Sequence, residues 1–452
     1  MARHFLDNSW LADSFSLQQW PGTNFIYWFI AGVGLKFLSF GQLAFWTRLI
    51  NYLLYAFPLE RIFRKLNIPL LPALLLLQVF FLKQEYLAGE WIWKGFEGKT
   101  LAYLFIFWSI DSVLDSRYYK AAVLAALATY CHVLVGGWYF AGVGLFLLFQ
   151  RTPFKSLVLI AATYTAIAAP FVGYLALNLF GGESVQSDPP ADWIYVFYRN
   201  LHHLVPTMKD HFWEHEWPFV AIIVISLILL YRPVLKDERG IKISRLVVAF
   251  NVLLIGGLIL TYVDSKGTFL KFYVLRMSSL ALFFELLWLT MVLRTFVKIP
   301  DARKRVALIA LAVLLVIAAG AGVNKNIPDW TESKSEAAYR EFIDFAKQST
   351  AEGEKFCFIG YNDKNENVRF IHDGNRDRLV SYKMVPEGDV AILEWYNRIL
   401  QRDALAADPL KFALLSAKYE LSYLVSKNRL STTDYDGELI YENPFYFVYK
   451  VP

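Results

Sequence analysis

Residues 154–180 read FKSLVLIAATYTAIAAPFVGYLALNLF, and Lys155 is the only charged residue among them. An apolar run of this length exceeds the roughly 20 residues that a helix needs to cross a bilayer. The stretch is therefore typical of a transmembrane helix. It predicts a membrane protein, and it decides how the neighbouring apolar runs are interpreted.

Similar runs recur through residues 1–323, and together they predict about ten spans. The predicted spans are Leu43–Phe63, Ile68–Lys83, Thr100–Val113, Ala121–Val135, Gly137–Phe149, Phe154–Phe180, Trp217–Tyr231, Ile243–Val263, Phe272–Thr295 and Val306–Val323. One further run, Asn24–Phe40, contains Lys36, and we interpret it as a juxtamembrane or re-entrant helix on the outer face.

The charges in the connections predict the orientation. Every second connection is short and basic: 61–65, 117–120, 151–155, 232–245 and 294–305. Lys and Arg are enriched in cytoplasmic loops, so these connections are predicted to be cytoplasmic and the others extracytoplasmic. This register leaves Met1 outside, so we expect a first span upstream of Met1.

Charged residues make up 19% of the chain, below the roughly 25% of an average soluble domain, but they are concentrated in residues 324–452. There, helical patterns at Glu332–Lys347, Ala391–Gln401 and Pro409–Tyr419 accompany short strand-like runs. The strand-like runs are Phe356–Tyr361, Leu421–Ser426, Glu438–Glu442 and Phe445–Val451. We therefore expect a polytopic α-helical membrane bundle over 1–323 and a soluble extracytoplasmic α/β domain over 324–452.

Two other function classes are disfavoured. The net charge of +5 reflects basic connections between apolar runs, which report orientation and give no indication of nucleic-acid binding. The two cysteines, Cys131 and Cys357, are too few for a disulfide framework or a cysteine-rich zinc site.

Ionisable residues gather on the predicted outer side, and such residues in or beside a bilayer are functional candidates. They are Asp7, Asp13, Glu90, Glu97, Lys99, His132, His202, His203 and Arg276. Ordinary roles are also open: interfacial charges for Glu97 and Lys99, a packing histidine for His132, and solvated loop histidines. Arg276 is the hardest to explain in that way, because a buried guanidinium needs an anionic partner such as a phosphate or a carboxylate.

An anion-binding, carboxylate-bearing pocket at the outer leaflet suits a lipid-linked sugar donor. A carboxylate would take a proton from the attacking hydroxyl. Cationic side chains or a divalent metal ion would neutralise the leaving phosphate, and a groove between spans would hold the lipid. The metal requirement and the metal ligands stay open.

Four stretches resemble the GT-C class of integral-membrane glycosyltransferases: LDNSWLADSF, GEWIWKGFEGKTLAY, YCHVLVGGWY and AKYELSYLVSKN. The resemblance implies a catalytic base at Asp13, with Asp7 second, and Glu97 or Glu90 binding the acceptor or a metal. It assigns the donor phosphate to Lys99, His132 and Arg276, with His202 or His203 nearby. It further implies transfer to a glycan, lipid or protein acceptor at a bacterial inner membrane. The first span usual in that class is missing from this sequence.

Two other functions remain open. A non-catalytic membrane subunit could keep the same scaffold without its chemistry. A transporter of lipid-linked glycans would place ionisable residues at the middle of the bundle, where this sequence has few.

Overall fold

The computed structural model describes residues 1–451 except 18–21, 85–86, 181–184, most of 210–234, 298–332, 363–365 and 432–434. Its contacts divide the chain into two compact units. The helical unit comprises Gly22–Asn178 and Val196–Ile327. The sheet unit comprises Met1–Pro21, Leu179–Tyr195 and Pro328–Pro452, so it also draws on segments outside the predicted C-terminal domain.

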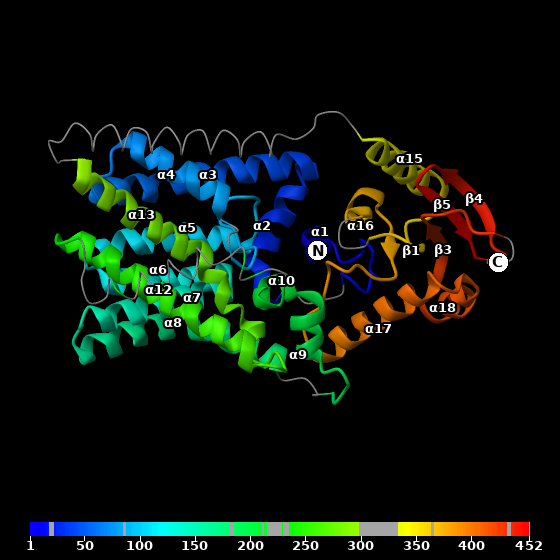
Figure 1. Ribbon diagram of the computed structural model, residues 1–452. Coiled ribbons are helices and arrows are strands. Elements are labelled where there is room, and N and C mark those ends of the chain that lie inside the picture. Colours follow the sequence, from blue (N-terminus) through cyan, green and yellow to red (C-terminus); the bar gives the residue numbers. More distant parts are fainter. Residues whose placement is uncertain are drawn as a thin grey trace. The chain divides into compact units, whose positions relative to one another are not determined.

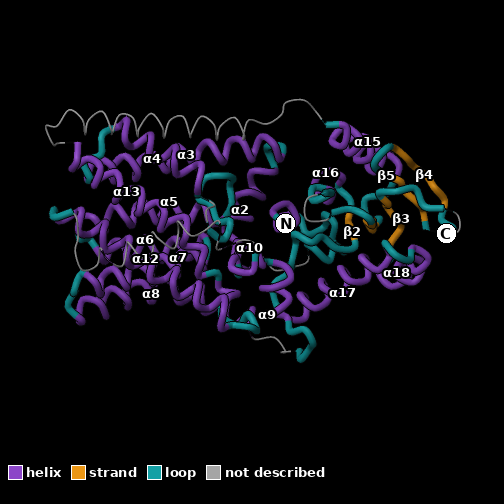
Figure 2. Tube along the Cα trace, viewed as in Figure 1, coloured by secondary structure: helices purple, strands orange, loops and turns teal. Residues whose placement is uncertain are grey.

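The helical unit is built from helices laid side by side (Figures 1 and 2). They are α2 (Phe25–Leu35), α3 (Phe40–Lys65), α4 (Leu70–Lys83), α5 (Gly98–Leu114), α6 (Tyr118–Cys131), α7 (Val133–Phe149), α8 (Phe154–Phe180), α12 (Glu238–Val263) and α13 (Ser278–Val297). The short helix α10 (Leu201–Leu204) follows α8 and precedes α12 in the chain. The short helix expected within Asn24–Phe40 is α2, and Ser39 caps the helix that follows it.

Among the described residues, three helical segments are long and apolar enough to cross a membrane: Phe154–Asn178, Glu238–Val263 and Leu270–Thr295. The fold is therefore compatible with membrane insertion. Shorter apolar helices lie at Phe25–Leu35, Leu70–Lys83 and Val133–Phe149. The predicted spans 217–231 and 306–323 fall almost entirely outside the described residues.

Basic side chains join the helix ends at one end of this unit, which we call the basic end. Lys65 at the end of α3 donates to the main-chain carbonyl of Asp111 (2.9 Å). Lys242 near the start of α12 donates to the carbonyl of Leu114 (2.9 Å). Because α3 and α5 end here and α12 begins here, successive helices alternate in direction, and Glu90, between α4 and α5, lies at the opposite end.

Close packing brings α6 and α7 together. They are separated by one residue, His132, whose backbone is extended. The predicted break after Val135 is therefore wrong by a few residues: the helix ends at Cys131, and Val135 lies in the first turn of the next one. A β-carbon on Gly136 would lie 2.3 Å from the backbone nitrogen of Thr129, so only glycine fits this approach.

The sheet unit contains a five-stranded mixed sheet of order β2-β1-β3-β5-β4. Its strands are β1 (Lys355–Ile359), β2 (Asp377–Arg378), β3 (Leu421–Ser426), β4 (Glu438–Asn443) and β5 (Tyr446–Lys450). The β1 strand pairs in parallel with β2 and β3, whereas β5 pairs antiparallel with β3 and β4. The predicted α/β character of this part is confirmed, although the short strand β2 was not expected.

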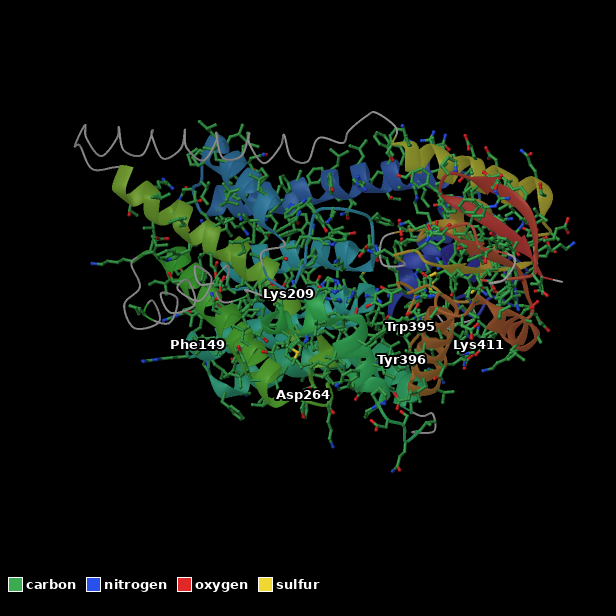
Figure 3. The ribbon with its side chains drawn as sticks, turned by 45° about the vertical axis from the view of Figure 1, so that its right-hand side comes forward. Phe149, Lys209, Asp264, Trp395, Tyr396 and Lys411 are labelled. Atoms are coloured by element: carbon green, nitrogen blue, oxygen red, sulfur yellow. The ribbon has the colours of Figure 1, made fainter. Side chains whose placement is uncertain are left out.

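Helices cover both faces of the sheet (Figure 1). They are α15 (Lys334–Ser349) on one face, and α17 (Asp389–Leu405) and α18 (Phe412–Tyr419) on the other; α16 (Phe370–Gly374) is short. Phe342 of α15 packs against Phe356 and Phe358 of β1, as the two-residue alternation of a strand requires. On α17, Trp395, which Figure 3 labels, is fully buried.

The first residues of the chain, including α1 (Ala2–Leu6), pack within the sheet unit. Trp10 is buried, and its indole nitrogen donates to the side-chain oxygen of Asn375. The Ser14 hydroxyl donates to the buried carboxylate of Asp377 (2.6 Å). A segment expected to be an outer loop of the bundle is therefore attached to the C-terminal domain.

Candidate functional site

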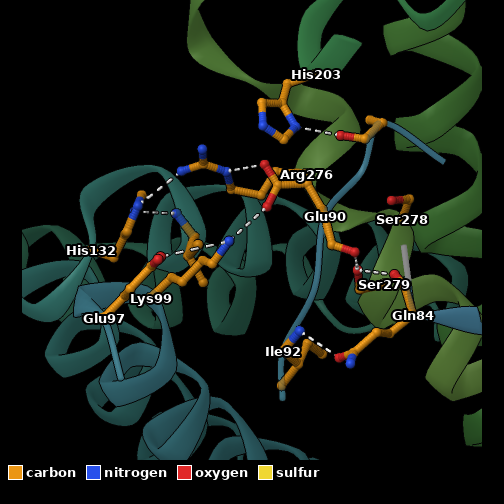
Figure 4. A network of polar contacts seen from close by, with 12 residues as sticks. Gln84, Glu90, Ile92, Glu97, Lys99, His132, His203, Arg276, Ser278 and Ser279 are labelled. Carbon is orange, nitrogen blue, oxygen red and sulfur yellow. Dashed lines mark hydrogen bonds and ion pairs between the residues drawn. The ribbon is translucent and has the colours of Figure 1, made fainter. Parts of the chain in front are cut away.

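One buried carboxylate binds two cations at the end of the helical unit opposite the basic end (Figure 4). Glu90 lies between α4 and α5, and its Oε1 accepts from Nε of Arg276 (2.9 Å). Its Oε2 accepts from Nζ of Lys99 (3.3 Å), in the first turn of α5. Nη1 of Arg276 also contacts Nε2 of His132 (2.8 Å). We call Glu90, Lys99, His132 and Arg276 the Glu90 cluster; the structure brings these four predicted residues together.

Hydrogen bonds to the backbone hold the loop that carries Glu90. The Gln84 side-chain oxygen accepts from the N–H groups of Ile92 and Trp93 (2.9 and 2.8 Å), and its nitrogen donates to the Trp93 carbonyl. The Ser279 hydroxyl lies 2.7 Å from the carbonyls of both Gln84 and Glu90. The loop is therefore fixed on both sides of its carboxylate.

Left-handed backbone conformations flank the cluster in two chain segments. Ala88 (φ 58°) and Gly89 (φ 62°) directly precede Glu90. Tyr273 (φ 55°) precedes the turn that carries Arg276, and its ring lies 4.3 Å from the guanidinium carbon. A non-glycine residue adopts this conformation only where its surroundings hold it, and such residues are enriched at functional sites.

The charges of the cluster favour an ionised Glu90. Burial alone would raise its pKa, but the Arg276 guanidinium and the Lys99 ammonium outweigh burial and lower the pKa to about 2. The side chains of Glu90, Lys99 and Arg276 are 3%, 10% and 13% exposed. At neutral pH two cations thus share one buried anion, and these three side chains carry a net charge of +1.

His132 takes part as a neutral imidazole. A guanidinium can only donate, so the contact with Arg276 requires an unprotonated Nε2 on His132. An imidazolium at this position would face two cations with no acceptor nitrogen left. His132 therefore limits where the Arg276 guanidinium can lie and adds no charge of its own.

Of the two predicted loop histidines, His203 lies closer to the cluster. Its Nδ1 donates to the carbonyl of Ala88 (2.6 Å), which leaves Nε2 as the acceptor of a neutral ring. Burial lowers the pKa of His203, although the nearby Glu90 opposes that change. His202 is exposed and packs its ring against His203, with the ring centres 3.9 Å apart.

Glu97 lies at the edge of the cluster. It is the residue before α5, its side chain is 52% exposed, and its carboxylate lies 3.8 Å from Nζ of Lys99. The same ammonium lies 3.8 Å from the ring centre of Trp91. Glu97 is therefore a solvent-accessible carboxylate beside a buried cation.

Asp7 and Asp13 lie in the sheet unit, whereas the cluster lies in the helical unit. Asp7 is exposed and its carboxylate accepts from the hydroxyl and the N–H of Ser9 (2.5 and 3.2 Å). The hydrogen bond from the Ser9 hydroxyl lowers the pKa of Asp7. Asp13 is also exposed.

This arrangement can bind an anion and position it. A planar guanidinium beside an ammonium offers several donors to phosphate oxygens. In the part of the chain that the structure describes, no three His, Cys, Asp or Glu side chains gather as metal ligands.

Four residues that were not predicted support the cluster: Gln84, Tyr273, Ser278 and Ser279. Ser278 donates to the carbonyl of Leu87 (2.9 Å), next to the contacts of Ser279. The pair of serines two residues after Arg276, in an otherwise apolar run, is the signal that could have indicated them.

No known family model matches the chain, and no curated protein is significantly similar to it in sequence.

Proposed function

We propose that this chain is a membrane glycosyltransferase that moves a sugar from a polyprenyl-phosphate donor to a glycan, lipid or protein acceptor on the outer face of the membrane. One observation supports the proposal: two buried cations, Arg276 and Lys99, share the single buried carboxylate Glu90 at one end of a bundle of apolar helices. A lipid phosphate at the membrane surface would supply the negative charge that this cluster lacks.

The proposed roles follow from the contacts. Arg276 and Lys99 would stabilise the departing lipid phosphate, and His132 would keep the guanidinium in place. Glu90, whose pKa is about 2, is too weak a base to take a proton and would position the two cations. The proton would pass to an exposed carboxylate, for which Glu97, beside Lys99 in the same unit, is the candidate.

The test is release of polyprenyl phosphate by the purified chain from a polyprenyl-phosphate sugar, with and without a divalent metal ion. Arg276→Ala should lower the rate by about 100-fold or more, because the leaving phosphate loses its main donor. Arg276→Lys should recover part of it. Arg64→Ala removes a 68% exposed arginine at the basic end and should leave the rate unchanged. Equal rates in wild type and Arg276→Ala would contradict the proposal.

The base is tested separately. If Glu97 takes the proton, Glu97→Gln should lower turnover by about 100-fold or more while binding of the lipid donor is retained. Unchanged turnover in Glu97→Gln would remove this residue from the catalytic step.

A second candidate, a non-catalytic subunit that binds a lipid phosphate, is favoured by the complete pairing of Glu90 with two cations. Such a subunit would bind polyprenyl phosphate and lose that binding in Arg276→Ala, yet release nothing from the donor. A binding measurement alongside the release assay therefore separates the two candidates.

A further inference from the structure

A second charged cavity lies at the basic end of the helical unit. It has a volume of about 580 Å³ and is formed where α7 ends and where α6, α8 and α12 begin. Its polar lining includes Arg151, Lys242, Arg245, Ser116, Thr152 and Ser156. The Glu90 cluster is at the other end of these helices, so this cavity belongs to a different site.

The lining of the cavity carries an excess of positive charge. Three cations line it, and Glu238 is the acidic residue among the lining residues. Lys242 is buried and bonds to Glu238 (2.7 Å), whose side chain is 79% exposed. The side chains of Arg151 and Arg245 form no hydrogen bond or ion pair with any other residue that the structure describes; the contact of Arg151 is a backbone one, from its N–H to the carbonyl of Leu148 (2.9 Å). The cavity therefore offers two guanidinium groups to an anion.

The first turn of a long helix adds to this preference. Thr152, Pro153 and Ser156 line the cavity at the start of α8, which runs to Phe180. The first N–H groups of a helix have no partner within the helix, and its dipole favours an anion there. Helix start, hydroxyls and guanidinium groups thus point to the same ligand chemistry, a phosphate.

The position of the cavity favours a lipid over free phosphate. It lies at the first turns of α8 and α12, two of the helices long and apolar enough to cross a membrane, and so at the depth of lipid headgroups. Beside it, the apolar side chains Phe154, Val158 and Leu159 of α8 are 80%, 49% and 45% exposed. These side chains suit contact with acyl chains.

We propose that this cavity binds the phosphate headgroup of an anionic phospholipid, with its acyl chains along α8. Basic pockets between membrane helices recognise such headgroups. The proposal requires that α8 and α12 cross a membrane, but it does not depend on sugar transfer by the Glu90 cluster.

The test uses the full chain in neutral nanodiscs. Binding of short-chain phosphatidylglycerol is measured by native mass spectrometry and compared with short-chain phosphatidylcholine and inorganic phosphate. The double variant Arg151→Gln/Arg245→Gln should bind phosphatidylglycerol about 30-fold more weakly, as expected for two cations at a membrane surface. The matched control Lys120→Gln/Lys155→Gln removes two exposed charges at the same end outside the cavity, and should change binding less than about twofold.

Three outcomes would overturn the proposal. Equal weakening in both double variants would mean that general attraction to the basic end explains binding. Equal binding of phosphatidylcholine would remove the preference for an anionic headgroup. Inorganic phosphate that binds as tightly as phosphatidylglycerol would show that the acyl chains contribute nothing. Polyprenyl phosphate release by Arg151→Gln/Arg245→Gln, measured in parallel, reports separately on the proposed function.

Discussion

Glu90 is the one carboxylate among the four residues of its cluster. Its carboxylate offsets two buried cations, and an uncompensated buried charge costs far more than the net value of the pair. We therefore expect Glu90→Gln to lower the free energy of unfolding by ~3–5 kcal/mol. Thermal unfolding of the purified chain measures this change. The control Glu97→Gln replaces a half-exposed carboxylate and should change stability by less than about 0.5 kcal/mol. Equal effects of the two would contradict the proposed role of Glu90.

The same residue predicts a pH dependence. The pKa of Glu90 is about 2 in the folded chain and ordinarily about 4.5, so the unfolded chain binds the proton more readily between these values. The stability that Glu90 contributes is therefore fully present above the ordinary value and is lost as the pH falls towards 2. The free energy of unfolding should therefore decrease less steeply with falling pH in Glu90→Gln than in wild type. Identical slopes would show that the charges of the cluster are not coupled as described.

At the scale of elements, the joint between α6 and α7 depends on one glycine. A methyl group at position 136 would overlap the backbone of Thr129. We expect Gly136→Ala to destabilise the chain by about 1–3 kcal/mol, the usual cost of overpacking.

Gly144 in the same helix provides a matched control, because nothing lies within 4 Å of a β-carbon built there. Gly144→Ala should be stabilising by up to about 1 kcal/mol through helix propensity. Thermal unfolding of both variants compares them directly. Destabilisation of similar size in the two would show that the close approach at Gly136 is unimportant.

Local patterns predicted the elements better than their joints. The helices α15 and α17 and the strands β3 and β4 fall within a few residues of their predicted ranges, since hydrophobic periodicity is read over neighbouring residues. The break at His132 was misplaced because it depends on how tightly Gly136 approaches Thr129, a contact across two helices. Patterning along one helix carries no information about such an approach.

The site was predictable in part for the same reason. Burying an arginine required an acceptor, and Glu90 was among the candidates, but 186 residues separate it from Arg276. Sequence could therefore name both residues without pairing them. Asp7 and Asp13 were grouped with them on predicted sidedness and on the resemblance of LDNSWLADSF, whereas the fold attaches their segment to the sheet unit.

At the scale of the whole molecule, the N-terminal segment forms a small apolar cluster within the sheet unit. Trp10 is 6% exposed and packs with Leu17 and Ile371. We expect Trp10→Ala to destabilise this unit by about 3–5 kcal/mol, as for other large buried side chains. Hydrogen exchange should accelerate in β1 and β3 but remain unchanged in α5 and α6.

Leu410→Ala is the matched control, because that side chain is 58% exposed and lies in the same unit. It should leave exchange in β1 and β3 close to wild type. Unchanged exchange in Trp10→Ala would indicate that the N-terminal segment rests on the sheet unit without stabilising it.

The Gln84 side chain has a consequence for how a ligand would arrive. Its amide group ties residues 92 and 93 to the end of α4, so these contacts hold the residues that follow Glu90 without a bound ligand. Binding of an anion would therefore not require a loss of conformational entropy in this segment. Its affinity would then depend mainly on the cost of removing water from the charged cluster and from the ligand. Changes in lipid tail length should alter the rates of association and dissociation, and leave the contacts with the charged headgroup unchanged.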